Sequence, residues 1–209
     1  MGDYLGDLQD AAFEAWLDQA EREWFEESYY VAVFVEGPGD IMFFRTVASK
    51  LKQAGYLKAD FDDTQIGFLP FGGDLLGHWI RSEAIQKLTR RFGVVVDSDR
   101  KSPRHSIPGR KLQWKQACEK VGGRFFILRK RESENYLHPD AIARAGHKLA
   151  PYDDFTDMKA TFGSNIIKVI GEMSAEEILE RDRYEEDGFS HHELKEIVEA
   201  FLALPSSWP

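Results

Sequence analysis

Cysteine and long apolar runs are nearly absent from this chain of 209 residues. Its one cysteine, Cys118, excludes a disulfide within the chain and a zinc site built from cysteines. No apolar run approaches the roughly 18 to 20 residues that a membrane-spanning helix requires. The first acidic residues, Asp3, Asp7 and Asp10, differ from the basic start of a signal peptide. These absences predict a cytoplasmic protein with no membrane partner.

The net charge of −9 conceals an uneven distribution of charge along the chain. Residues 1–40 hold eleven acidic residues and one basic residue, and residues 151–200 hold fourteen acidic and five basic residues. Residues 81–131 hold fifteen basic residues and four acidic ones. Such a basic segment is typical of a surface that binds phosphate groups. The alternative is that it pairs with acidic surfaces of the same fold or of a partner.

Hydrophobic patterning predicts an α/β fold with a mostly parallel sheet of about four strands. Four nearly unbroken apolar runs have the length and composition of buried strands. They lie at 29–35, 65–71, 92–96 and 124–128. Amphipathic helices are expected between them, at 40–53, 74–89 and 110–120. Strands that alternate with helices indicate βαβ units with helices on both faces of the sheet.

The chain divides into three predicted parts. An acidic amphipathic helix is expected in residues 1–28, the α/β domain in residues 29–150, and a C-terminal helical extension in residues 151–209. The strand pattern stops after Glu132, and only helices are expected beyond it, at 139–146, 158–170, 175–183 and 191–204. The two acidic ends are expected to lie outside the layer that contains the sheet.

Six carboxylates follow three of the predicted strands, at the edge where open parallel sheets bind ligands. They are Glu36 and Asp40, Asp97 and Asp99, and Glu132 and Glu134. Carboxylates that converge in a dry pocket repel one another unless cations lie between them. Oxygen ligands favour Mg²⁺ or Mn²⁺ over zinc. Because alternate side chains of an extended chain share a face, Asp97 and Asp99 are predicted to meet one ion.

Three segments resemble the motifs of a known domain. Residues 35–40, Val-Glu-Gly-Pro-Gly-Asp, resemble the first TOPRIM motif, and residues 94–99, Val-Val-Val-Asp-Ser-Asp, resemble its DxD motif. Residues 132–137, Glu-Ser-Glu-Asn-Tyr-Leu, resemble a segment of the OLD (overcoming lysogenization defect) nucleases. TOPRIM effectors of phage-defence systems such as Gabija and PARIS have similar segments. The resemblance covers about residues 29–140 and implies a TOPRIM, Rossmann-like sheet.

The resemblance implies an endonuclease that hydrolyses DNA or RNA with two Mg²⁺ or Mn²⁺ ions. The implied metal ligands are Glu36, Asp40, Asp97, Asp99, Glu132 and Glu134. The implied catalytic residues are Glu36, Asp97 and a lysine, for which Lys168 is the first choice and Lys159 the second. A role in antiphage defence with an ABC/OLD-type ATPase is also implied. Because the chain has no Gly-x-x-x-x-Gly-Lys-[Ser/Thr] loop, that ATPase would be a separate protein.

Basic residues flank the DxD motif and the Glu-x-Glu motif. Those predicted to contact a nucleic-acid backbone are Arg100, Lys101, Arg104, Arg110, Lys111, Lys130 and Arg131. The alternative for the last two, together with Arg129, is that they neutralise the carboxylates in the absence of metal. The alternative for the whole chain is a non-catalytic TOPRIM module that binds nucleic acid or scaffolds a complex. A homo-oligomer is compatible with either function.

Several other polar residues favour structural roles. Tyr136 is predicted to pack in the core or contact the motif carboxylates, because a topoisomerase tyrosine lies in a domain that this chain lacks. His191 and His192 are predicted to form the solvated start of a helix, since adjacent side chains on a helix diverge. Cys118 is predicted to be a small packing residue.

Overall fold

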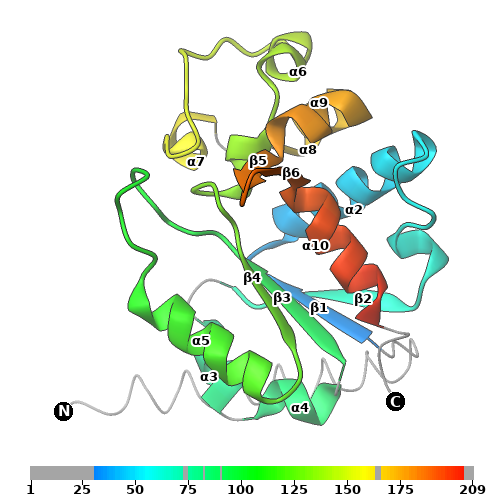
Figure 1. Cartoon of the computed structure of the whole chain (residues 1–209), viewed down its shortest axis with the longest axis vertical. Helices are drawn as coiled ribbons and strands as arrows, with labels where there is room; N and C mark the ends of the chain where they lie inside the picture. The colour runs from blue at the N-terminus through cyan, green and yellow to red at the C-terminus, as the bar shows by residue number, and fades with distance from the viewer. Residues whose placement is uncertain (1–30, 73–74, 82, 90, 163–165, 205–209) are drawn as a thin grey trace.

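A computed structural model describes residues 31–72, 75–81, 83–89, 91–162 and 166–204. The predicted helix in residues 1–28 lies outside them. The described chain contains a four-stranded sheet in the order β2-β1-β3-β4, flanked by helices (Figure 1). Its strands are β1 (Val31–Val35), β2 (Ile66–Pro70), β3 (Phe92–Val96) and β4 (Arg124–Ile127). All neighbouring strands are parallel, so the predicted α/β architecture is confirmed and is compatible with a Rossmann-like fold.

The strand order places a topological switch point between β1 and β3. The chain leaves β1 to form β2 on one side and returns to form β3 on the other. Every residue of β1 and β3 is buried, as expected of central strands that are covered on both faces. In open α/β sheets, ligands bind at the carboxyl ends of the strands beside such a switch point. Glu36 and Asp97 directly follow these two strands.

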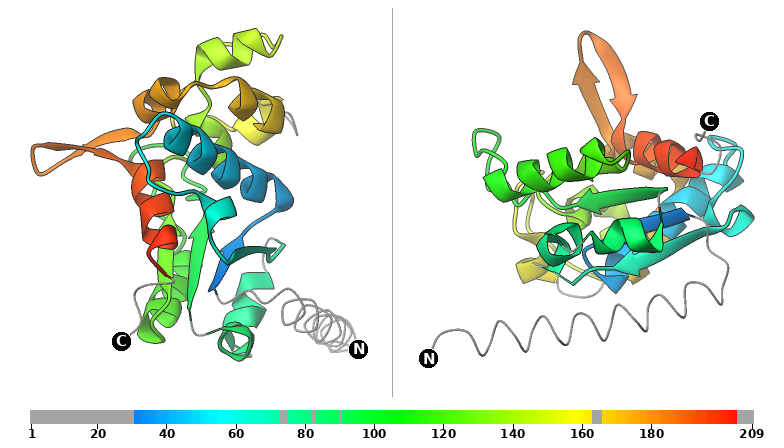
Figure 2. Two further views of the ribbon diagram at one scale, coloured as in Figure 1. Left: turned by 90° about the vertical axis from the view of Figure 1, so that its right-hand side faces the viewer. Right: turned by 90° about the horizontal axis from the view of Figure 1, so that it is seen from below.

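Helices cover both faces of the sheet (Figures 1 and 2). Among the described residues before β4 they are α2 (Pro38–Gln53), α3 (Leu76–Arg81), α4 (Ala84–Leu88) and α5 (Gly109–Lys120), with a short 3-10 helix η1 (Phe61–Asp63). Those that follow are η3 (Ser133–Tyr136), α6 (Pro139–Arg144), α7 (Met158–Phe162), α8 (Ile166–Glu172), α9 (Ala175–Arg181) and α10 (Glu193–Leu202). The predicted helices at 74–89 and 158–170 are each two shorter helices. None of the described helices combines the length and the apolar character that crossing a membrane requires.

The C-terminal helices share the hydrophobic core of the sheet. One face of α10 is apolar and buried, and its Phe201 ring lies 6.5 Å from the ring of Phe44 and 5.3 Å from that of Phe126. Val169 of α8 belongs to the same buried cluster as Val95 of β3. The expectation that residues 151–209 lie outside the sheet layer is therefore wrong, because α10 supplies the apolar cover of one sheet face.

A β-hairpin interrupts the predicted C-terminal helices. Strands β5 (Arg183–Glu186) and β6 (Phe189–His192) pair in antiparallel orientation and project from the rest of the molecule (Figure 2). Asp187 and Gly188 connect them with φ angles of 52° and 80°. Asp-Gly in this conformation is typical of a tight hairpin turn. The prediction of helices alone after Glu132 is therefore wrong.

The hairpin changes the role of the two adjacent histidines. His191 stacks on the ring of Tyr184 at 5.0 Å, with Nδ1 3.0 Å from Glu196 Oε1. His192 ends β6, and its Nδ1 lies 2.8 Å from Asp182 Oδ1. The predicted helix start is confirmed for His192, which is the N-cap of α10. The prediction that the two side chains are solvated is wrong, because both rings are half-buried and paired with carboxylates.

Replacing Gly93 with alanine is expected to destabilise the protein by about 1 to 3 kcal/mol, because overpacking a core forces side chains to shift. A Cβ atom on Gly93 of β3 would overlap the ring of Phe201 on α10. Gly109→Ala is the matched control, since its Cβ would have no atom within 4 Å. Urea denaturation measures both changes. Equal unfolding free energies for the two variants would contradict the packing of α10 on β3.

Candidate metal and nucleic-acid site

Ser133 connects three of the predicted metal ligands at the carboxyl edge of the sheet. Its backbone N–H donates to Asp97 Oδ1 at 3.1 Å. Its hydroxyl lies 2.9 Å from Asp40 Oδ1 and 3.2 Å from Glu134 Oε2. These carboxylates come from the start of α2, the end of β3 and the 3-10 helix η3. The structure thus brings together acidic groups that lie up to 94 residues apart in the sequence.

Lys111 contacts a second set of acidic groups on the other side of Asp97. Its Nζ lies 2.6 Å from Asp99 Oδ2, 2.7 Å from the Asp97 carbonyl oxygen and 3.4 Å from Glu36 Oε1. The Lys111 side chain is only 3% exposed. Glu36 Oε1 also accepts the Asp97 backbone N–H at 3.0 Å. Lys111 therefore belongs to the interior of the site.

The two carboxylates of the DxD motif diverge. Ser98 and Asp99 both donate their backbone N–H groups to the Arg131 carbonyl oxygen, at 3.0 and 3.1 Å. Asp99 has a left-handed φ of 55°, so the chain turns instead of continuing as a strand. Asp97 contacts Lys159, whereas Asp99 contacts Lys111. The two carboxylates therefore have different partners in this structure, and their sharing of one ion stays a prediction.

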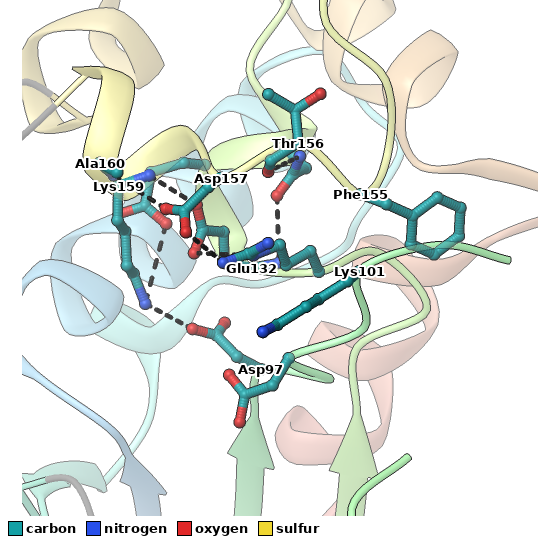
Figure 3. Close-up of polar contacts among 12 residues, drawn as sticks. Asp97, Lys101, Glu132, Phe155, Thr156, Asp157, Lys159 and Ala160 are labelled. Atoms are coloured by element: carbon teal, nitrogen blue, oxygen red, sulfur yellow. Dashed lines mark hydrogen bonds and ion pairs between the residues drawn. The ribbon is translucent and has the colours of Figure 1, made fainter. Parts of the chain in front are cut away.

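Of the two candidate catalytic lysines, Lys159 is the one that reaches the carboxylates (Figure 3). Its Nζ contacts Asp97 Oδ2 and lies 3.9 Å from Glu134 Oε2. Lys168, the first choice from the sequence, instead donates to the Ala145 carbonyl oxygen at 2.7 Å. Lys159 belongs to α7, whereas Lys168 belongs to α8, which packs against α2 and α6. Lys168 therefore bonds to the end of α6, and the second choice of lysine is the one at the site.

Glu132 and Asn135 position the segment that carries Lys159. Glu132 Oε1 accepts the Lys159 backbone N–H at 2.6 Å. The Asn135 amide donates to the carbonyl oxygens of Asp153 and Thr156 at 2.9 and 3.0 Å, and its Oδ1 accepts the Glu132 N–H at 3.1 Å. Glu132 is therefore engaged by α7 and does not join the carboxylates around Ser133. The sequence points to Glu132 only through its place in the Glu-x-Glu motif, and it does not indicate that Glu132 holds the backbone of Lys159.

Burial and mutual repulsion make this group of carboxylates hard to ionise. Burial raises the pKa of Asp97 well above its ordinary value, and the charge of Glu36 raises it further. Burial also raises the pKa of Glu132 and of Glu134. Burial lowers the pKa of Lys159, but the charges of Asp97 and Glu134 outweigh this effect and raise it. A cation bound here would offset the burial and repulsion and so favour the ionised form of these carboxylates.

Two of the predicted nucleic-acid contacts are buried. Lys111 lies within the site, and Lys130 is 7% exposed, with Nζ 2.7 Å from Asp154 Oδ1 and 5.0 Å from the centre of the Tyr136 ring. Burial lowers the pKa of Lys130. Neither side chain is accessible to a nucleic-acid backbone, so this prediction is wrong for both. Lys111 is an internal partner of Glu36 and Asp99. Lys130 pairs with Asp154, which is not one of the six strand-end carboxylates, so the alternative that it neutralises them is not supported.

The other predicted contacts surround the same edge. Arg131 pairs with Asp157, and Arg100 lies over the Phe155 ring at 5.1 Å while its Nε donates to the His105 carbonyl oxygen at 3.0 Å. Figure 3 shows the Lys101 side chain extending toward Asp97. Three basic side chains are exposed here: Lys101, Arg104 and Arg110.

Tyr136 is a core residue that links the motif to α10. It is fully buried, its hydroxyl donates to Glu193 Oε2, and it accepts the Lys130 backbone N–H at 3.3 Å. Burial raises the pKa of Tyr136 well above its ordinary value. Glu193 also accepts the Arg129 backbone N–H at 2.7 Å, and burial raises the pKa of Glu193 to about 7. No hydrophobic pattern identifies Glu193 from the sequence, because it lies at the boundary of β6 and α10.

A different group has the tightest arrangement of metal-binding atoms among the described residues. Ligand atoms of His138, Asp140 and Glu177 all lie within 4.8 Å of one another. Arg144 already places a guanidinium nitrogen 2.8 Å from Glu177 Oε1 and so supplies positive charge to this group. The strand-end carboxylates are spaced more widely, with Lys111 and Lys159 between them.

Comparisons of the chain with protein-family models, with curated proteins and with solved structures gave no match. The assignment of functional residues therefore depends on the geometry of the strand ends. It depends also on the resemblance of three short motifs, at 35–40, 94–99 and 132–137, to those of TOPRIM nucleases.

Proposed function

We propose that this chain is a Mg²⁺- or Mn²⁺-dependent nuclease that hydrolyses phosphodiester bonds of DNA or RNA. The observation that carries the proposal is the convergence of Asp40, Asp97 and Glu134 around Ser133 at the switch point of the sheet. Their oxygen-only donor set suits a hard divalent cation. The raised pKa values of Asp97 and Glu134 reflect burial and repulsion that such a cation would offset.

Each group has a distinct proposed role. Asp40, Asp97 and Glu134 would hold the cation, which when bound would activate water and stabilise charge on the phosphate. The Lys159 side chain is 44% exposed, so it can turn away from the carboxylates and donate to the phosphate during cleavage. The exposed side chains that would contact the nucleic-acid backbone are Lys101, Arg104 and Arg110.

The motif resemblance supports a narrower proposal about the biological role. It suggests the effector of an antiphage defence system that works with a separate ABC/OLD-type ATPase. The chain has no phosphate-loop sequence, so control by ATP would require a second protein. Adding a candidate ATPase and measuring its effect on cleavage would test this part independently.

Nicking of supercoiled plasmid and cleavage of single-stranded RNA test the nuclease proposal. The wild type is expected to cleave at least one substrate in Mg²⁺ or Mn²⁺ and neither in EDTA. Asp97→Asn keeps an acceptor for the Ser133 N–H but removes the charge, so activity should fall about 100-fold or more. Asp62→Asn is the control, because it removes an exposed carboxylate that pairs only with Arg45 at 2.6 Å among the ion pairs described.

A non-catalytic module is the second candidate function. Lys111 and Lys159 already neutralise part of the carboxylate charge, as in a site that needs no metal. Nucleic-acid binding that is unchanged by EDTA, with no cleavage of either substrate even when the ATPase is added, would support this alternative. The same result would contradict the nuclease proposal.

A further inference from the structure

The Lys111 ammonium lies where acidic groups from β1 and β3 converge. Its Nζ contacts Asp99 Oδ2, the Asp97 carbonyl oxygen and Glu36 Oε1, at 2.6, 2.7 and 3.4 Å. An ammonium has three hydrogens to donate, and these three oxygens account for all of them. Lys111 therefore provides a positive charge and a fixed geometry at the point where Glu36 and Asp99 could otherwise share a metal ion.

The Lys111 ammonium is less able than the Lys159 ammonium to move out of the carboxylate site. The Lys159 side chain is 44% exposed, whereas the Lys111 side chain is 3% exposed. Lys111 lies in the first turns of α5, which packs on the sheet through the buried Cys118. Its partners Glu36 and Asp99 are 25% and 49% exposed, so the constraint lies in the buried ammonium itself, which also bonds the Asp97 carbonyl oxygen at 2.7 Å. A divalent cation can therefore displace Lys159 but not Lys111.

The acidic groups thus form two separate sets. Asp40, Asp97 and Glu134 surround Ser133 and face the partly exposed ammonium of Lys159. Glu36 and Asp99 surround the fixed ammonium of Lys111. Two-metal sites hold their ions about 4 Å apart to stabilise the attacking and leaving oxygens. A lysine in one of the two positions can supply charge there without a second ion.

We infer that the site takes one divalent cation, held by Asp40, Asp97 and Glu134, and that Lys111 replaces the second ion. This inference rests on the proposed nuclease function and revises the two-ion expectation from the sequence. Because a lysine charge does not depend on metal concentration, the cleavage rate should rise with Mg²⁺ concentration with a Hill coefficient near one.

Electron paramagnetic resonance of the full chain titrated with Mn²⁺ tests the inference. The wild type is expected to give the spectrum of an isolated ion at the site. Lys111→Ala vacates the second position and leaves its carboxylates free, so it is expected to show an exchange-coupled pair of Mn²⁺ ions. Lys115→Ala, one turn along α5, removes an exposed lysine that lies 3.8 Å from Glu119, and should behave as the wild type. A coupled pair requires ions about 4 Å apart, so a single ion at His138, Asp140 and Glu177 does not produce one.

Each outcome separates the inference from the nuclease proposal. A coupled pair in the wild type would overturn the inference and leave the proposed function intact. No bound Mn²⁺ in the wild type would contradict the proposed function itself. An isolated ion in a Lys111→Ala protein that circular dichroism shows to be folded would also overturn the inference. If that variant does not fold, the wild-type spectrum and Hill coefficient decide.

Discussion

Lys159→Met is expected to lower metal-dependent cleavage about 100- to 1,000-fold, whereas Lys168→Met should leave it within about twofold of the wild type. Lys159 contacts Asp97 and lies 3.9 Å from Glu134, so its charge is beside the phosphate that the proposed cation would bind. Loss of one donor that stabilises transition-state charge typically costs this much in rate. The Lys168 ammonium donates to the Ala145 carbonyl oxygen and therefore does not lie beside the carboxylates that would hold the cation.

Single-turnover rates at saturating Mn²⁺ measure this difference, because they separate the chemical step from substrate binding. Lys168→Met is a matched control, since it removes the same charge from the same part of the chain. Circular dichroism establishes that both variants fold. Equal loss of activity in the two variants, or loss in Lys168→Met alone, would contradict the assignment of Lys159.

The free energy of unfolding is expected to decrease as the pH rises from about 4.5 to 8, by about 3 kcal/mol from Glu193 alone. Burial raises the pKa of Glu193 from 4.5 to about 7. Below pH 4.5 the group is protonated in both folded and unfolded chains, so it has no effect. Between pH 4.5 and pH 7 the unfolded chain loses this proton while the folded chain retains it, so stability falls. Above pH 7 both are ionised and the loss is complete. The raised pKa values of Asp97, Glu132 and Glu134 act in the same direction.

Urea denaturation in EDTA at pH 5 and pH 8 measures this dependence. Glu193→Gln cannot ionise, so its stability should change less between the two pH values than that of the wild type. Glu199→Gln is the control on the same helix, because Glu199 is exposed and pairs with Lys195 at 2.7 Å. An equal pH dependence in wild type and Glu193→Gln would show that the buried Glu193 charge does not limit stability.

The strands were predictable because their physical signal is local. In β1 and β3 every residue is buried, so each strand appears in the sequence as an unbroken apolar run. The carboxyl ends of parallel strands meet at one edge of the sheet, so the strand pattern alone predicts that Asp97 lies near Glu36. The convergence of acidic groups therefore follows from the pattern of strands.

The direction of each side chain was not predictable from spacing. Asp97 and Asp99 were expected to share a face, but the left-handed backbone at Asp99 separates them. That turn depends on hydrogen bonds to Arg131, which lies 32 residues further along the chain than Asp99. Lys111 reaches the interior only because α5 packs across the sheet. Such long-range contacts have no signature in a short motif.

The β5–β6 hairpin was missed for a different reason. Its strands have four residues each, and three of the four residues in β5 are charged. Alternation of apolar and polar residues is therefore weak, and only the Asp187-Gly188 pair signals a turn. The neighbouring helix α10 is strongly amphipathic, so the helical pattern dominates this part of the sequence.

Anomalous X-ray diffraction from crystals of the full chain grown with Mn²⁺ tests the central claim most directly, because it locates the bound ion. One anomalous peak is expected, coordinated by Asp40, Asp97 and Glu134, with the Lys111 ammonium still between Glu36 and Asp99. A peak at His138, Asp140 and Glu177 with none at the ends of β1 and β3 would contradict it.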